Sequence, residues 1–303
     1  MEQTKSTYDF WVRCAAFTAT SVAFLLVMLK LYAWLMTDAS AMLASATDSL
    51  LDLFASVMNV VILRFALAPA DQEHKFGHGK AESLAGLVQA AFVLGSALLL
   101  IINGVERIIS PKVIVHTEVG IWVSIIAIFL TLALVILQKV VIAKTNSLAI
   151  SADSLHYQSD LILNLGVLAA LFLSQGYWIK ADGVFTLLVG GHLMLGAAKI
   201  IWLSVHHLMD HELAAEEVDK IKDIILSHEK ALGMHELRTR QAGHQRFIQF
   251  HLELDDNLSL LDAHSIGEAI EREIELALAP CEVFIHHDPS SVVGSELSTK
   301  EIV

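Results

Sequence analysis

Two pairs of potential metal ligands lie in apolar stretches of the sequence, and each pair is spaced four residues apart. Asp48 and Asp52 lie in SATDSLLDLFASVMN, and His156 and Asp160 lie in SLHYQSDLIL. Residues at i and i+4 share one face of a helix, so each stretch would present two ligands side by side. Three carboxylates and one imidazole suit a tetrahedral site for Zn²⁺, whereas a hard ion such as Mg²⁺ prefers oxygen ligands alone.

Acidic side chains in a membrane helix need a compensating partner. One acidic residue at the bilayer centre is unfavourable by about 2.5–3.5 kcal/mol, so three in one bundle require protons or a cation. The alternative is that these groups only form hydrogen bonds between helices. Asn59 continues the polar face of the first pair, and Asp153 and Asn164 continue that of the second. For Asp153, an entrance or capping role and coordination both remain open.

Six long apolar segments would position these ligands. The 303-residue chain is 55% hydrophobic and 17% charged, with a mean hydropathy of +0.59, which is typical of membrane proteins. Each segment is close to the roughly 20 residues that a bilayer requires, and the first is expected to stay as an anchor because no signal-peptide cleavage site is evident. The expected spans are residues 12–36, 40–67, 83–109, 116–138, 148–174 and 182–205.

Charge is distributed unevenly along the chain. Residues 1–210 hold 14 acidic and 12 basic side chains, whereas residues 211–303 hold 19 acidic and 8 basic ones and most of the histidines. This argues against nucleic acid or anionic lipid as the partner of the tail and suits cations. Lys and Arg are more frequent in the segments on the side of the N-terminus, so the positive-inside rule predicts cytosolic termini. With only Cys14 and Cys281, no disulfide framework is expected.

The composition changes near Asp210, and the following residues predict a small α+β domain. LAAEEVDKIKDIILSHEK and SLLDAHSIGEAIEREIELAL have helical periodicity. MHELRTRQAGHQRFIQFHLELD predicts two strands around a glycine-containing turn, and CEVFIHH predicts a third strand. We therefore expect an all-α six-helix transmembrane domain over residues 1–208, an αββαβ domain over residues 209–290, and a disordered tail over residues 291–303.

The loop between the second and third spans, DQEHKFGHGKAE, holds another set of potential ligands. Asp71, His74 and His78 lie within eight residues, and Gly77 and Gly79 allow the loop to bend so that the three could converge. Solvated loops also commonly carry Asp and His, so the pattern alone leaves both interpretations open.

The predicted sheet and second helix of the tail carry five further candidate ligands. Any one surface histidine is more often solvated than metal-bound, but several near strand ends are typical of a metal site. His287 stands between two of the candidates and could compete as a ligand. The histidines at 206, 207, 211, 228 and 244 match no specific pattern. The five candidates are His235, His251, His264, His286 and Asp288.

Six segments together resemble the cation diffusion facilitator family, in particular its bacterial zinc and ferrous-iron efflux pumps: TDSLLD, DQEHKFGHGKAES, ADSLHYQSD, HELRTRQAG, FIQFHLELD and FIHHDP. The resemblance implies a homodimer with a metallochaperone-like cytosolic domain that exports Zn²⁺ in exchange for H⁺ across the bacterial inner membrane. It places the transport site on the two intramembrane pairs, a second zinc site on the loop residues, and a binuclear zinc site on the five tail candidates. It also implies a charge interlock of Lys80 and Asp210 that holds the dimer together.

The expected function is therefore proton-coupled efflux of a divalent cation, without enzymatic activity. Carboxylates and imidazole must be deprotonated to bind metal, which would couple the metal to protons. A membrane-anchored metal enzyme would need an open coordination position and a general acid or base, and no HExxH motif occurs. A membrane-anchored zinc sensor would have no use for intramembrane carboxylates. The cation stays open among Zn²⁺, Cd²⁺, Fe²⁺, Co²⁺ and Mn²⁺, and zinc in the tail is regulatory or structural.

Overall fold

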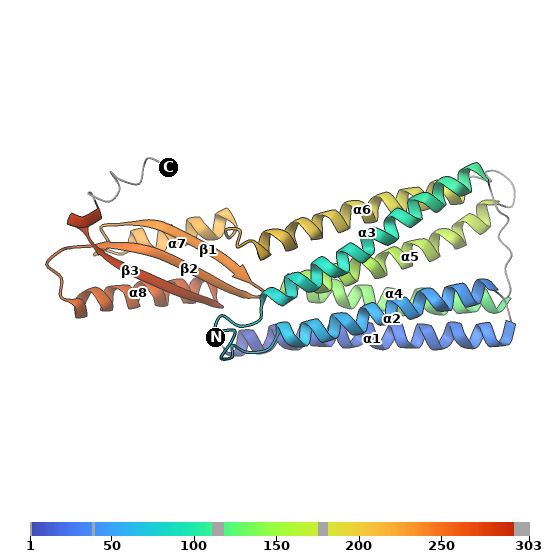
Figure 1. Cartoon of the computed structure of the whole chain (residues 1–303), viewed down its shortest axis with the longest axis horizontal. Coiled ribbons are helices and arrows are strands. Elements are labelled where there is room, and N and C mark those ends of the chain that lie inside the picture. Colours follow the sequence, from blue (N-terminus) through green and yellow to red (C-terminus); the bar gives the residue numbers. More distant parts are fainter. Residues whose placement is uncertain (1, 38–39, 111–117, 175–180, 294–303) are drawn as a thin grey trace. The chain divides into compact units, whose positions relative to one another are not determined.

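Two compact units make up the structure, a computed structural model of the chain (Figure 1). The structure describes residues 2–37, 40–110, 118–174 and 181–293. One unit runs from Tyr8 to Val205 and is helical, and the other contains the described chain from His206 onward. The predicted boundary after residue 208 falls close to this division.

The helical unit contains six helices among the described residues. Within that part of the chain, α1, α2, α3, α4 and α6 are each long and apolar enough to cross a membrane. The helix that carries His156 is α5, and α4 continues beyond the predicted end of its span at residue 138. The bounds are α1 (Glu2–Thr37), α2 (Ser40–Ala66), α3 (Lys80–Ile109), α4 (Glu118–Thr145), α5 (Leu148–Ser174) and α6 (Ala181–Leu208).

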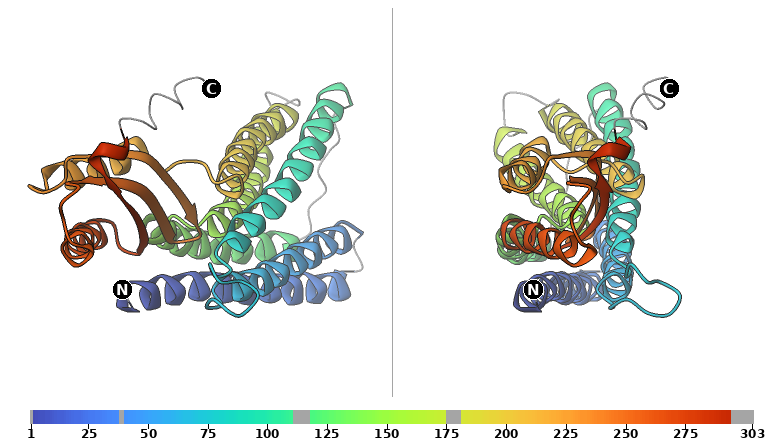
Figure 2. Two further views of the ribbon diagram at one scale, coloured as in Figure 1. Left: turned by 60° about the vertical axis from the view of Figure 1, so that its left-hand side comes forward. Right: turned by 90° about the vertical axis from the view of Figure 1, so that its left-hand side faces the viewer.

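Small side chains let the helices of this unit approach closely. The helices α3 and α4 both pack along α5, and α2 packs against α3. Buried alanines at 90 and 97 on α3, 152 on α5 and 197 on α6 contribute to one apolar cluster, and α3 lies beside α6 in every view (Figures 1 and 2). Small residues at helix contacts are typical of membrane bundles, where packing rather than water exclusion drives association.

Two glycines mark the closest approach of α3 and α6. A Cβ atom at Gly183 of α6 would lie 2.9 Å from the carbonyl oxygen of Gly104 on α3. One at Gly190 would lie 2.8 Å from Cγ1 of Ile101. A larger residue at Gly183 would meet backbone atoms of α3 and force the two helices apart, whereas one at Gly190 would first displace the Ile101 side chain.

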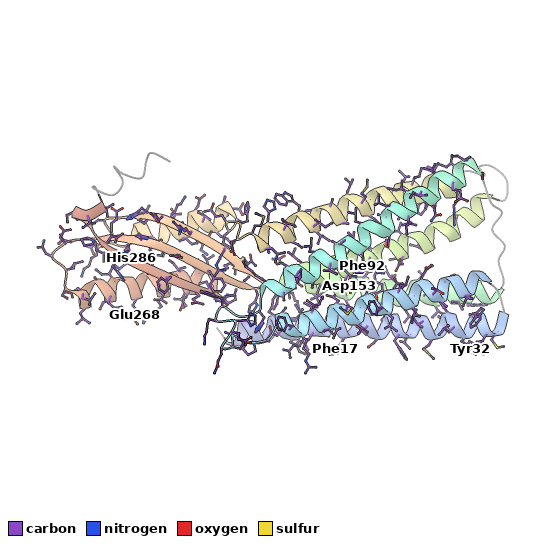
Figure 3. The ribbon with its side chains drawn as sticks, viewed as in Figure 1. Phe17, Tyr32, Phe92, Asp153, Glu268 and His286 are labelled. Atoms are coloured by element: carbon purple, nitrogen blue, oxygen red, sulfur yellow. The ribbon has the colours of Figure 1, made fainter. Side chains whose placement is uncertain are left out.

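Large apolar side chains cover the outside of the helical unit. Phe17, Tyr32 and Phe92, labelled in Figure 3, are 59%, 63% and 61% exposed. A continuous apolar surface of this kind marks contact with a membrane or a protein rather than with water. In contrast, the polar side chain of Asp153 lies buried within the bundle (Figure 3).

The second unit is a small α+β domain with a mixed sheet. The strand order is β1-β2-β3, with β2 antiparallel to β1 and parallel to β3. Gly243, with φ +61°, permits the two-residue turn between β1 and β2, and the parallel step to β3 passes through α8. The elements are α7 (Ala215–Ser227), β1 (Gly233–Ala242), β2 (Gln245–Leu254), α8 (Leu260–Leu278) and β3 (Cys281–Pro289).

One hydrophobic core joins the helices of this domain to its sheet. Ile221 and Ile225 of α7 and Ile270 and Ile274 of α8 are fully buried in the same cluster as Phe250 of β2. Each pair is spaced four residues apart, so each helix buries one face. Removal of apolar surface from water stabilises this packing of the helices on the sheet by about 25 cal/mol per Å².

The predicted fold class is confirmed: a helical transmembrane domain precedes a small αββαβ domain. The disordered tail differs at its start. Residues 290–293 form a helical turn after β3, the side chain of Val293 is buried, and the Ser291 backbone N–H donates a 3.0 Å hydrogen bond to Asp256. The burial of Val293 and the hydrogen bond of Ser291 order the start of this segment. Residues 294–303 lie outside the described part.

We expect Gly183→Leu to destabilise the helical unit. The new side chain would overlap the Gly104 carbonyl and the Ile108 side chain, and overpacking of this kind costs about 1–3 kcal/mol. The measurement is the thermal midpoint of the detergent-solubilised protein. Gly191→Ala is the matched control, because nothing lies within 4 Å of its Cβ position. Equal midpoints for the two variants would contradict the close packing of α3 and α6.

Candidate metal centres

Three ligand groups from α2 and α5 meet inside the helical unit. The Nε2 atom of His156 lies 2.9 Å from Oδ1 of Asp52 and 3.6 Å from Oδ2 of Asp160. One ligand atom from each residue lies within 4.8 Å of the other two, and all three side chains are partly buried. The structure thus brings together three of the four predicted intramembrane ligands, and two carboxylates with one imidazole suit Zn²⁺.

Asp48, the fourth predicted ligand, lies outside this group. Its side chain is exposed, one turn before Asp52 on α2. At the neighbouring residue, Ser49 accepts a 2.7 Å hydrogen bond from the Lys30 ammonium, which brings a positive charge of α1 to this turn. Because Asp48 and Asp52 share a helix face, the role of Asp48 as a ligand stays a prediction.

Asp153 connects α5 to two other helices. Its Oδ2 atom accepts a 2.7 Å hydrogen bond from the side-chain amide of Gln138 on α4, and its Oδ1 atom accepts a 3.5 Å one from Gln89 on α3. The residue is 1% exposed. Asp153 thus forms hydrogen bonds between helices, which is neither of the two roles left open for it by the sequence, an entrance or cap and coordination. Its contacts fix α5 one turn before His156.

Glu82 of α3 holds the N-terminal end of α5. Its Oε2 atom accepts a 2.5 Å hydrogen bond from the Tyr8 hydroxyl. The carboxylate also accepts hydrogen bonds from the Ser147 hydroxyl and the Leu148 backbone N–H. Leu148 is the first residue of α5, so Glu82 satisfies one of the backbone donors that a helix leaves unpaired at its start. The sequence analysis missed Glu82, because a single acid just before a predicted span resembles an ordinary boundary charge.

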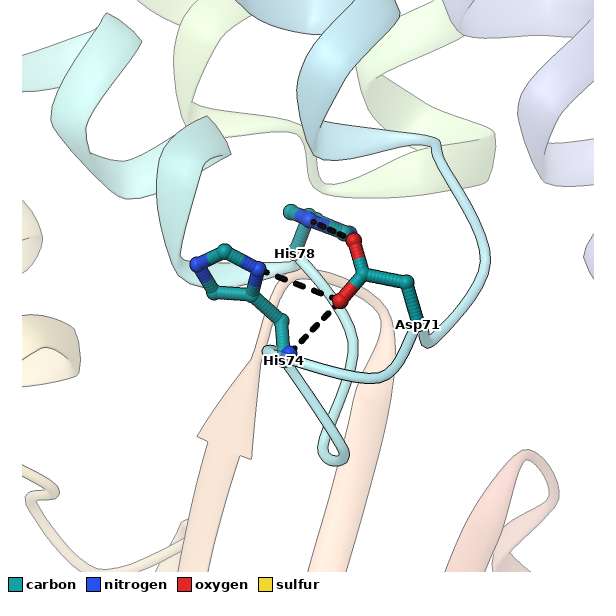
Figure 4. A group of neighbouring side chains, drawn as sticks. All are labelled: Asp71, His74 and His78. Carbon is teal, nitrogen blue, oxygen red and sulfur yellow. Dashed lines mark hydrogen bonds and ion pairs between the residues drawn. The ribbon is translucent and has the colours of Figure 1, made fainter.

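The loop between α2 and α3 brings its three predicted ligands together (Figure 4). The two carboxylate oxygens of Asp71 lie 3.3 Å from His74 Nδ1 and 3.3 Å from His78 Nε2. Gly77 has φ +77°, which permits the tight bend between the histidines. Backbone N–H groups of His74 and Glu73 lower the pKa of Asp71, so its carboxylate is kept in the charged form that binds a cation.

In the C-terminal domain, Asp288 gathers three histidines, one from each strand. Its Oδ2 atom lies 2.7 Å from His251 Nδ1 and 3.3 Å from His235 Nε2. Its Oδ1 atom lies 3.1 Å from His286 Nε2. The register explains the row, because His251 of β2 pairs with His235 of β1 on one side and with His286 of β3 on the other.

Glu253 is a further member of this centre that the sequence analysis missed. Its Oε1 atom lies 3.0 Å from Nδ1 of His235, whose Nε2 faces Asp288. A carboxylate on the second ring nitrogen orients a metal-binding imidazole and raises its basicity. The available signal was the spacing: Glu253 follows His251 by two residues, so both lie on one face of β2.

The structure does not bring His264 and His287 into this group. His264 is exposed on α8. The His287 ring lies against Gly267 of α8, and its Nε2 atom is buried without a hydrogen-bond partner among the described residues. Burial lowers the pKa of His287, and the nearby His264 lowers it further. Strand alternation explains the difference, because His287 points to the opposite face from His286 and Asp288.

The two residues of the predicted charge interlock lie in different units. Lys80 is the first residue of α3. Asp210 follows α6 in a left-handed conformation with φ +57°, and its Oδ1 atom lies 3.4 Å from the Arg240 guanidinium. Their pairing across a dimer stays a prediction.

Two family models cover most of the chain. The cation efflux transmembrane domain matches residues 16–209. The cytoplasmic domain of cation efflux proteins matches residues 213–290. The division between the two matches lies close to the division between the two compact units.

Two relatives that match over nearly their whole length agree with these family models. The cation-efflux pump FieF of Shewanella oneidensis is 48% identical over 96% of this chain and 98% of its own. FieF of Yersinia pestis is 43% identical over 95% of this chain and 96% of its own. The metal-bound C-terminal domain of the CzcD transporter from Thermotoga maritima is 28% identical, with a TM-score of 0.23, over 25% of this chain and 94% of that domain.

We expect Glu253→Gln to weaken metal binding at the C-terminal centre. The amide oxygen has no full negative charge, so it is a weaker hydrogen-bond acceptor for the ring N–H of His235. Loss of such an outer carboxylate typically lowers metal affinity about 10–100-fold. The measurement is a competition titration of the purified protein with Zn²⁺ and a chelator. Glu282→Gln, an exposed change on β3, is the control. An affinity equal to that of the unaltered protein would show that Glu253 does not orient His235.

Proposed function

The chain belongs to the cation efflux family, and we propose that it exports Zn²⁺ from the cytosol in exchange for protons. It is a multi-pass membrane protein whose relatives are cation efflux pumps. The proposal concerns the cargo, the coupled ion and the site. Cd²⁺ and Fe²⁺ are secondary cargoes that the same ligands would accept.

The convergence of Asp52, His156 and Asp160 is the observation that supports this function most directly. These residues come from two helices, lie inside an apolar bundle and offer ligand atoms within 4.8 Å of one another. A bundle that served only as an anchor would be more stable without them, because charged groups in hydrocarbon are unfavourable. In the metal-bound state Asp48 supplies the fourth ligand from the preceding turn of α2.

Proton exchange follows from the chemistry of one atom. The Nε2 atom of His156 faces both carboxylates, and its single lone pair holds either a proton or a metal ion. A proton at Nε2 makes the imidazolium a partner for Asp52 and Asp160, and Zn²⁺ displaces it. The empty, deprotonated site would carry several uncompensated negative charges, which disfavours a change of access without cargo. Zinc and protons therefore cross in opposite directions.

Anchoring of α5 keeps this site together while access alternates between the two sides. The hydrogen bonds of Asp153 to Gln138 and Gln89 hold α5 to α4 and α3. Glu82 holds its N-terminal end. Geometry fixed before the ion arrives reduces the ordering cost of binding.

The remaining parts of the proposal concern assembly. The protein is a homodimer in the inner membrane with both termini in the cytosol, and its C-terminal domain binds zinc at the centre of Asp288. Metal bound there favours the arrangement of the dimer that it fits best, as a regulator or as a fixed structural element. The alternative, a membrane-anchored zinc sensor without transport, shares these metal centres but predicts no flux.

We expect Asp160→Asn to abolish zinc flux into proteoliposomes under an imposed pH gradient. The amide retains the size of the side chain but removes the negative charge and one proton-exchanging ligand, so uptake should fall to the level of empty vesicles. Asp223→Asn, an exposed change in α7, is the control and should keep normal flux. Zinc binding without flux in the unaltered protein, after verified insertion, would support the sensor instead.

We expect zinc affinity at the transport site to fall as the pH is lowered. Protons compete with Zn²⁺ for the ligands, so displacement of one proton weakens binding by roughly tenfold per pH unit below the ligand's pKa. The measurement is the zinc dissociation constant at pH 7.5 and pH 6.0, with His156→Asn as the variant. If the variant and the unaltered protein lost affinity equally, His156 would not be the proton-exchanging ligand.

A further inference from the structure

The C-terminal end of α6 closes with a Schellman turn. Asp210 adopts the left-handed conformation with φ +57°. The His211 backbone N–H donates to the His206 carbonyl at 3.0 Å, and the Asp210 N–H donates to the His207 carbonyl at 3.4 Å. These two bonds are the 6→1 and 5→2 bonds of that motif, so the backbone fixes which side chains meet across the turn.

Two imidazoles stand where such a turn usually has an apolar contact. The rings of His206 and His211 have centroids 4.8 Å apart and planes inclined by 52°. This geometry is that of the histidine pairs within the candidate metal centres of the loop and the C-terminal domain. Their centroid distances and angles are 4.5 Å and 44° for His74–His78, 4.9 Å and 40° for His235–His251, and 4.6 Å and 48° for His251–His286.

The hydrogen bonding of His211 leaves its other ring nitrogen available as a ligand. Its Nδ1 atom lies 2.9 Å from the backbone carbonyl oxygen of Glu212. A carbonyl only accepts, so Nδ1 carries the proton and Nε2 carries the lone pair. A backbone carbonyl on the second ring nitrogen is one of the ways in which proteins orient a metal-binding histidine.

Histidine near a helix C-terminus has a simpler explanation, namely a favourable interaction with the last carbonyl groups. That explanation accounts for each ring separately, because a neutral imidazole N–H also donates to a carbonyl, as His211 does to Glu212. It does not account for the contact between the rings of His206 and His211. A shared cation that binds neutral imidazoles explains both the pairing and the tautomer.

We propose that His206 and His211 form a metal site of their own at the end of α6, which takes an imidazole-preferring ion such as Zn²⁺ or Cu²⁺, with water in the remaining positions. The bound ion would fix the Schellman turn and with it Asp210, whose carboxylate lies 3.4 Å from Arg240. This site does not depend on the proposed transport function, because it shares no residue with the intramembrane group.

The first test measures the zinc content of the full-length protein in detergent after equilibrium dialysis against Zn²⁺. The double variant His206→Leu/His211→Leu should bind one Zn²⁺ fewer per protomer. Leucines restore the apolar contact that is usual in this turn, so the thermal midpoint without metal should not fall. His228→Leu removes a histidine of the same unit that makes no ring contact in the described residues, and it should leave the zinc content unchanged.

A second test identifies the ligands directly. In a background that lacks the histidines of the other three centres (His74→Ala, His78→Ala, His156→Ala, His235→Ala, His251→Ala and His286→Ala), bound Cu²⁺ should show nitrogen hyperfine structure from two imidazoles in electron paramagnetic resonance. His211→Leu alone should remove that signal. Unchanged zinc content in the double variant, or an equal loss with His228→Leu, would overturn the proposal. Asp160→Asn should leave this ion in place, which separates the site from the one proposed for transport.

Discussion

The contact of the His156 imidazole with the carboxylates of Asp52 and Asp160 is the interaction on which the helical domain depends. Charges inside an apolar bundle must be neutralised where they stand, because water cannot reach them freely. A proton or a metal ion at one nitrogen achieves this only if α2 and α5 stay in register. The supporting hydrogen bonds at Asp153 and Glu82 serve that register. Elsewhere in the bundle, small side chains let α3 and α6 approach closely.

In the C-terminal centre, strand pairing rather than helix packing brings the candidate ligands together. Strand pairing places His235, His251 and His286 in one row, and a shift of one residue in any strand would turn its ligand to the opposite face. The apolar core between the sheet and its two helices resists such a shift, because it would bury the polar face of the strand. The geometry of this centre therefore comes from backbone hydrogen bonds, whereas that of the intramembrane group comes from side-chain packing between helices. The first kind of site is set locally, and the second depends on the whole bundle.

Sequence patterns predicted the helices and strands well, because long apolar runs and alternating apolar residues can be seen directly in the sequence. They also predicted that His156 and Asp160 lie side by side on one helix, which needs only their spacing, whereas the role of Asp48 beside Asp52 stays a prediction. Contacts between elements were less accessible. Glu82 and Glu253 were missed because each contacts a residue of another element. Glu82 has no spacing to mark it, and the spacing of Glu253 from His251 shows a shared strand face but not the contact with His235. The role of His287 as a ligand was left open in the sequence. Only the structure shows that its ring lies against α8, on the face of β3 opposite to His286 and Asp288.

The glycine contact between α3 and α6 has a mechanical consequence. Where a Cβ atom at Gly183 would already meet the Gly104 carbonyl, there is no layer of side chains that can rearrange as the helices slide past each other. Sliding would press the Ile108 or Leu187 side chain against the backbone of the facing helix. We therefore expect α3 and α6 to move together as one rigid pair. Any rocking of the bundle would then concentrate at other seams, where longer side chains can change rotamer. Because the backbones of α3 and α6 come so close at Gly183, we expect bending of the domain to occur at its other helix contacts.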